Sequence, residues 1–145
     1  CEKGHAWTTA LHLLTEMPAN DLKPTTLAFT HVIRACQMAL AWEYALWQFR
    51  TMPSMRLDQD AEAYLGALKA CAHGLRWDWA VELLREMVSS QLNPSEAEHN
   101  ICVGICMNAQ QWRWAVHVFA EMGLRKVPAD LFTYSSAMTV CERSR

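Results

Sequence analysis

Six cysteines in a chain of 145 residues raise the question of a metal site or a disulfide framework. Five of them recur at a constant interval of 35 residues: Cys1, Cys36, Cys71, Cys106 and Cys141. If this interval is a stacked helical unit, equivalent atoms lie about 9–10 Å apart. That spacing is too long for ligands that share one ion, and it exceeds the roughly 7 Å Cα limit of a disulfide. We therefore expect small buried thiols, with no intramolecular disulfide and no metal.

One local alternative for metal binding is a site made of His99, Cys102 and Cys106, since the two cysteines share a helix face. We favour packing, because Cys106 already belongs to the periodic series. No histidine begins a His-x-Glu or His-Glu-x-x-His motif, and Cys-x-x-Cys and Gly-rich phosphate loops are absent from the sequence. We therefore expect a protein that acts by binding, without cofactors, and not an enzyme.

Composition indicates an ordinary folded chain, with 52% apolar and 19% charged residues, a net charge of -2 and a pI near 6.3. The longest apolar run, 101–107, is far shorter than the roughly 18 residues of a membrane span, so we expect no membrane partner. The slight acidity lacks the electrostatic footprint of tight nucleic-acid binding.

Other residue types keep the same 35-residue step as the cysteines, which predicts an array of repeats. They are Trp7, Trp42, Trp77 and Trp112; Ala10, Ala45, Ala80 and Ala115; and Met17, Met52, Met87 and Met122. Apolar residues recur at three- and four-residue steps over 27–39 and again over 42–52, which predicts two helices per unit, with the alanines at close helix approaches. Pro24 and Pro94 follow second helices and mark turns into the next unit. Because neither helix buries its apolar face alone, the fold class is all-α: an α-solenoid of stacked 35-residue helix-turn-helix repeats.

The array divides into a partial repeat at 1–25, full repeats at 26–60, 61–95 and 96–130, and a partial repeat at 131–145. The chain is expected to begin inside a first helix and to complete a second helix near Met17. We therefore interpret it as a fragment of a longer array, with further repeats of the same chain at both ends.

The repeated residues resemble those of the pentatricopeptide repeat family along all 145 residues. The resemblance rests on the period, on Phe29, Tyr64 and Tyr134 near first-helix starts, on Ala-Cys at 35–36 and 70–71, on the second-helix runs 42–46 and 77–87, and on Leu-Asn-Pro at 92–94. Tetratricopeptide repeats differ, since they have a 34-residue period and place Leu-Gly where this chain has Ala after each Trp.

The resemblance implies a mitochondrial or plastid protein that binds single-stranded RNA, one base per repeat, along its first helices. In the family, selection rests on the residue after the first-helix aromatic and on the last residue of the same repeat. By that pattern Thr30 with Asp60 favours guanine and Asn100 with Asp130 favours uracil, whereas Leu65 with Ser95 departs from it. Ser135 is a reader without a partner in this chain.

The family also sandwiches each base between side chains near first-helix starts, and it contacts phosphates with cations. Leu27 and Phe132 fit the sandwiching position, whereas Glu62 and Ala97 depart from it. The candidate phosphate contacts are Lys3, Arg34, Lys69 and Arg143.

The sequence supports two hypotheses for the function of the chain. The first is sequence-selective RNA binding in organellar RNA processing, stability or translation, which the two matching pairs favour. The alternative is a structural scaffold for protein or ribonucleoprotein partners, such as an organellar ribosome, which Leu65, Glu62 and the acidic balance favour. Trp79 and Trp114 either pack against a neighbouring repeat or form a protein-contact surface.

Overall fold

The computed structural model describes the backbone of residues 3–143, which form eight α-helices and two short 3-10 helices with no strand among them. The all-α fold class is therefore confirmed. The chain divides into two compact units, one ending at His73 and the other beginning at Gly74, and each is described by itself.

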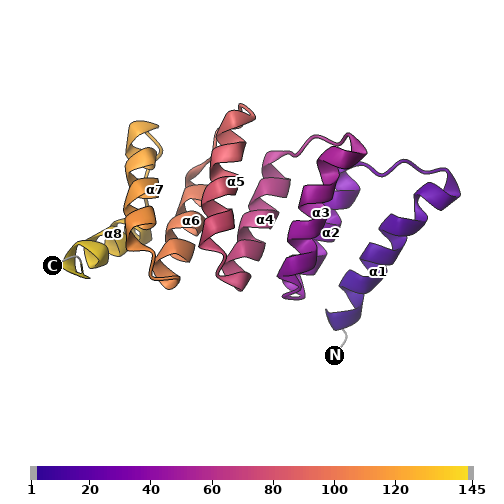
Figure 1. Ribbon diagram of the computed structural model, residues 1–145, viewed down its shortest axis with the longest axis horizontal. Coiled ribbons are helices and arrows are strands. Elements are labelled where there is room, and N and C mark those ends of the chain that lie inside the picture. The colour runs from indigo at the N-terminus through magenta and orange to yellow at the C-terminus, as the bar shows by residue number, and fades with distance from the viewer. Residues whose placement is uncertain (1–2, 144–145) are drawn as a thin grey trace. The chain divides into compact units, whose positions relative to one another are not determined.

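The first unit contains one helical hairpin, formed by α2 and α3, which is preceded by α1 and followed by α4 (Figure 1). Its elements are α1 (Lys3–Glu16), η1 (Pro18–Asn20), α2 (Thr26–Met38), α3 (Trp42–Thr51), η2 (Met52–Met55) and α4 (Ala61–Gly74). α2 packs against both α1 and α3. The rings of Phe49 in α3 and Tyr64 in α4 lie edge to face, 4.9 Å apart, in the core.

The second unit repeats the alternation of first and second helices: α5 (Trp77–Ser89), α6 (Glu96–Asn108), α7 (Trp112–Leu124) and α8 (Leu131–Arg143). α6 packs against α5, α7 and α8. The buried Cys102 thiol donates to the backbone carbonyl of Ala80, 3.2 Å away, and so joins α6 to α5.

The last residue before each first helix caps that helix through its side chain. Thr25 accepts from the Ala28 amide at the start of α2. Asp60 accepts from the Ala63 amide at the start of α4, and Asp130 from the Thr133 amide at the start of α8. Ser95 and Glu98 form a reciprocal capping box at the start of α6. These caps satisfy backbone donors that the first turn of a helix leaves free.

The turns that close the helices use left-handed backbone without glycine. Every described residue with positive φ is a non-glycine residue, with φ between 51° and 61°: Asp21, Leu40, Arg56, Leu75, Gln91, Gln110 and Lys126. Leu40, Leu75 and Gln110 follow first helices, whereas the other four follow second helices.

Most of the periodic small residues pack as expected; the exceptions among the described residues are Ala10 and Cys141, whose side chain is exposed and not buried. Ala45, Ala80 and Ala115 are buried, and Cys36, Cys71 and Cys106 are buried thiols that form no disulfide. Ala10 is instead partly exposed, because the described residues cover α1 mainly on the side that faces α2.

The first helix differs from expectation at its start. His5 and Ala6 occupy the repeat positions of the turn at 40–41, yet α1 runs through them without a break. Among the described residues, no helix combines the length and the apolar character needed to cross a bilayer.

Candidate nucleic-acid interface

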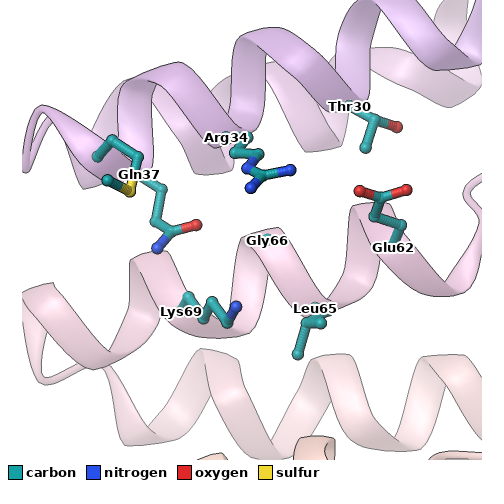
Figure 2. Close-up of a pocket in the computed structure, with 8 residues that line it drawn as sticks. Thr30, Arg34, Gln37, Glu62, Leu65, Gly66 and Lys69 are labelled. Carbon is teal, nitrogen blue, oxygen red and sulfur yellow. The ribbon is translucent and has the colours of Figure 1, made fainter.

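A groove of about 240 Å³ lies between the first helices α2 and α4 (Figure 2). Helix α2 contributes Thr30, Arg34, Gln37 and Met38, and helix α4 contributes Glu62, Leu65, Gly66 and Lys69. Five of these positions were singled out from the sequence: Thr30, Arg34 and Lys69 as RNA contacts, and Glu62 and Leu65 as departures. The sequence did not point to Gln37 or Gly66, since neither carries a reader or cation position.

Gly66 sets the width of the groove. A Cβ atom at this position would lie 2.8 Å from Cγ2 of Ile33, which is fully buried on α2. The absence of a side chain therefore allows α2 and α4 to approach closely, as small residues do at tight helix contacts.

Three charged side chains line the groove without pairing with one another. Arg34 and Lys69 are exposed cations and Glu62 is an exposed carboxylate. In the range 3–143, none of the three takes part in an ion pair or a side-chain hydrogen bond. Their charges are therefore available to a ligand.

Thr30 lies at the edge of the groove, but its side chain is only 5% exposed. Its hydroxyl donates to the backbone carbonyl of Thr26, 2.9 Å away on the same helix. With its proton used in this way, Thr30 retains lone pairs as an acceptor only. Its predicted partner Asp60 caps α4, since Oδ1 accepts a hydrogen bond from the Ala63 amide. The other carboxylate oxygen, Oδ2, is left as a further acceptor.

The other predicted reading pair meets at a residue that the sequence did not indicate. The Thr133 hydroxyl lies against Oδ1 of Asn100 and also against Oδ1 of Asp130, 2.6 Å away. Thr133 is fully buried. Hydrogen bonds from Thr133 hold the pKa of the Asp130 carboxyl below its usual value, mainly the bond from the hydroxyl and then the bond from the backbone amide. Thr133 thus lies between the two side chains, and its single hydroxyl proton can be donated to only one of the two oxygens at a time.

The remaining predicted contacts differ in exposure. Leu27 and Phe132 are 62% and 59% exposed, so both offer apolar surface to a base. Ser135 is exposed, and its hydroxyl donates to the backbone carbonyl of Leu131 at 2.6 Å. Leu65 is half-buried in the groove, and Ser95 is occupied by the capping box. The side chains of Lys3 and Arg143 lie outside the described residues.

The sequence matches no protein-family model and no curated protein. Solved structures do resemble it. The crystal structure of the maize pentatricopeptide repeat protein PPR10 has a TM-score of 0.78 at 21% identity, over 93% of this chain and 19% of that one. The pentatricopeptide domain of Arabidopsis thaliana protein-only RNase P 1, in complex with tRNA, has a TM-score of 0.86 at 14% identity, over 99% and 75%.

The chain has the pentatricopeptide repeat fold. A crystal structure of the pentatricopeptide repeat protein PPR10 in complex with an 18-nt psaJ RNA element also shares this fold, with a TM-score of 0.61 at 12% identity over 92% of this chain. The chain spans 19% of the length of the maize protein and 25% of the protein chain in the RNA complex.

The second helices of this pentatricopeptide fold carry aromatic rings that contact the next repeat. Trp7 lies 5.1 Å from Tyr44, and Trp77 lies 6.1 Å from Trp114. The Arg85 guanidinium covers the Trp114 ring at 5.2 Å. Trp114 therefore packs against a neighbouring repeat, as one of the two sequence interpretations expected.

Trp79 is partly exposed, and the Arg76 guanidinium lies 5.5 Å from its ring centre. Arg76 also forms a two-point ion pair with Asp78, and this hydrogen bond lowers the pKa of that carboxyl.

The alternative metal site is not assembled. His99 is buried with Nδ1 2.9 Å from the Ser95 carbonyl, and the Cys102 thiol is directed at Ala80. Over the described part of the chain, no three His, Cys, Asp or Glu side chains come together as ion ligands.

Proposed function

We propose that this chain binds single-stranded RNA along its first helices. The observation that carries the proposal is the groove between α2 and α4, where Arg34 and Lys69 stand as cations without a protein partner. Unpaired cations in a groove attract phosphates, and the gain comes largely from the release of counterions. The fold of the maize protein solved with RNA supports the same function.

The proposed base readers are the two pairs and Ser135. Thr30 and Asp60 each present an acceptor, which suits the N–H donors of guanine. The amide group of Asn100 has N–H donors, which suit the carbonyl oxygens of uracil, and Thr133 lies between Asn100 and Asp130. Leu27 and Phe132 would stack on bases, and Lys3 and Arg143 would add phosphate contacts to those of Arg34 and Lys69.

A role in RNA processing, stability or translation in a mitochondrion or plastid is the finer part of the proposal. It rests on the family resemblance. The chain would then serve as a binding module without catalytic residues of its own.

The test removes the two groove cations and compares the result with a matched loss of charge. Arg34→Gln/Lys69→Gln is paired with Arg125→Gln/Lys126→Gln, since both pairs replace one arginine and one lysine, all exposed. Arg125 and Lys126 do not line the groove. Binding of a fluorescently labelled single-stranded oligouridylate is measured at low salt, where phosphate attraction is strongest.

We expect the groove variant to bind at least tenfold more weakly than the chain itself, and the control variant to bind within about twofold. Equal losses in both variants would mean that only net charge matters. No binding by the unmodified chain at low salt would reject RNA as its ligand.

A structural scaffold is the second candidate, favoured by the burial of Thr30 and by the capping roles of Asp60, Ser95 and Asp130. These observations explain the predicted readers without RNA. A chain that binds no RNA at low salt but elutes with a protein partner from an organellar extract would favour this candidate.

A further inference from the structure

Glu62 is an unexplained charge in the groove between α2 and α4. A carboxylate beside phosphates is repelled by them, yet Glu62 lines the same groove as Arg34 and Lys69. Figure 2 shows its carboxylate turned from α4 toward Thr30 on α2. It forms no ion pair with either cation and no side-chain hydrogen bond with any described residue.

The separated charges restrict the ligand. Two cations call for an anionic group, whereas Glu62 calls for hydrogen-bond donors at another point of the same ligand. A nucleotide meets both needs, since its phosphates are anionic and its base edge carries N–H groups. An acidic peptide has backbone N–H donors, but its side-chain carboxylates would be repelled by Glu62, and a basic peptide would be repelled by Arg34 and Lys69.

The geometry of a carboxylate favours one base. Its two oxygens accept best from two adjacent donors. Guanine presents N1–H and the N2 amino group side by side, whereas adenine and cytosine place an acceptor beside their amino group. Uracil has a single N–H between two carbonyl oxygens. Guanine is therefore the base that Glu62 matches.

We propose that Glu62 selects guanine in this groove: its carboxylate accepts the N1–H and N2–H groups of the base while Arg34 and Lys69 hold the flanking phosphates. The inference deepens the proposed RNA binding and rests on it. Glu62 offers both of its oxygens, whereas Thr30 is nearly buried and Asp60 already uses Oδ1 to cap α4.

The experiment compares Glu62→Gln with Glu43→Gln. Both glutamates are exposed, and both lie in the first turn of a helix, so each change removes one negative charge at the same helical position. Glu43 lies on α3 and does not line the groove. The probes are two labelled single-stranded oligouridylates, one with two central guanines and the other with two central adenines, and circular dichroism checks folding of each variant.

We expect the chain to prefer the guanine probe and Glu62→Gln to lose about 5-fold to 150-fold of that preference, the range for loss of a bidentate base contact. Glu43→Gln should keep the preference.

Two results would overturn the inference while leaving RNA binding intact: no preference for guanine in the unmodified chain, or an equal gain in affinity for both probes in Glu62→Gln. The second would mean that Glu62 only repels phosphates. If the unmodified chain binds neither probe at low salt, the proposed function fails and the selection by Glu62 fails with it.

Discussion

Thr30 is a predicted base reader whose hydroxyl is already committed. Its proton goes to the Thr26 carbonyl, so the side chain meets a base only as an acceptor and through a narrow exposed edge. The sequence identified Thr30 by its place after Phe29, but residue type alone does not reveal where a hydroxyl donates. The same holds for Thr133, whose contact with Asn100 depends on the approach of α6 and α8, whereas its contact with Asp130 is local to the start of α8.

Two replacements of Thr30 distinguish the effect of its hydroxyl from the effect of its size. Thr30→Val keeps the volume and removes the acceptor, so we expect a lower preference for guanine over adenine, whereas Thr30→Ser keeps the preference. Titration of the two labelled RNAs measures the difference. Equal preferences in both variants would show that the Thr30 hydroxyl does not read the base.

The buried thiols make stability depend on pH at the alkaline end. Burial raises the pKa of Cys36 and of Cys106 from 9.0 to about 11. Below pH 9 both states keep these protons. As the pH rises from about 9 to 11 the unfolded chain releases them first, so the free energy of unfolding decreases.

At about 1.36 kcal/mol per pKa unit, the loss approaches about 2–3 kcal/mol for each thiol by pH 11. Urea unfolding between pH 8 and pH 11 measures it. Alkaline pH acts on more of the chain than these two thiols, so the control is Cys36→Ala/Cys106→Ala, which should show a smaller decrease over the same range. Identical slopes would contradict the raised pKa values.

At the level of elements, the sequence predicted the helices and the turns that follow second helices, but not the turns that follow first helices. The three- and four-residue spacing predicted helices over 27–39 and 42–52, and the structure has Thr26–Met38 and Trp42–Thr51. The turns at Pro24 and Pro94 lie where the sequence predicted them, whereas the turns after the first helices escaped prediction because Leu40, Leu75 and Gln110 have the left-handed backbone that glycine normally marks. The break expected before Trp7 is absent, since periodicity says where a helical face lies and not where the helix starts.

Two helical glycines should respond to alanine in opposite directions. Gly66→Ala places Cβ against Ile33, a stiff β-branched side chain with no free space, and we expect a net destabilisation of about 1–2 kcal/mol. Gly123→Ala on α7 meets no atom within 4 Å and should stabilise by about 0.5–1 kcal/mol through helix propensity alone. Chemical denaturation of both variants gives the comparison, and a stabilised Gly66→Ala would refute the tight approach of α2 and α4.

For the whole molecule, the charge balance limits how strongly RNA is held. The net charge is -2, and four cations are proposed to contact phosphates. Each contact with a single strand contributes about -0.7 to the slope of log affinity against log salt, so the four together predict a slope near -2.8. Titrations at several salt concentrations measure this slope. A much steeper slope would require cations beyond these four, and a slope of zero would exclude phosphate contacts.

The seven left-handed turn residues are also positions where substitution by glycine should increase thermal stability. Left-handed backbone at a non-glycine residue destabilises the folded chain by roughly 1–2 kcal/mol. Glycine removes this cost but loses more conformational entropy on folding, so the net stabilisation is smaller. Gln110→Gly should therefore raise the melting temperature by a few degrees, and Leu75→Gly should add to it, because well-separated substitutions are usually additive. None of these seven positions lines the groove. Glycine substitutions at these turns can therefore raise the melting temperature in separate steps without changing the residues that would contact a ligand.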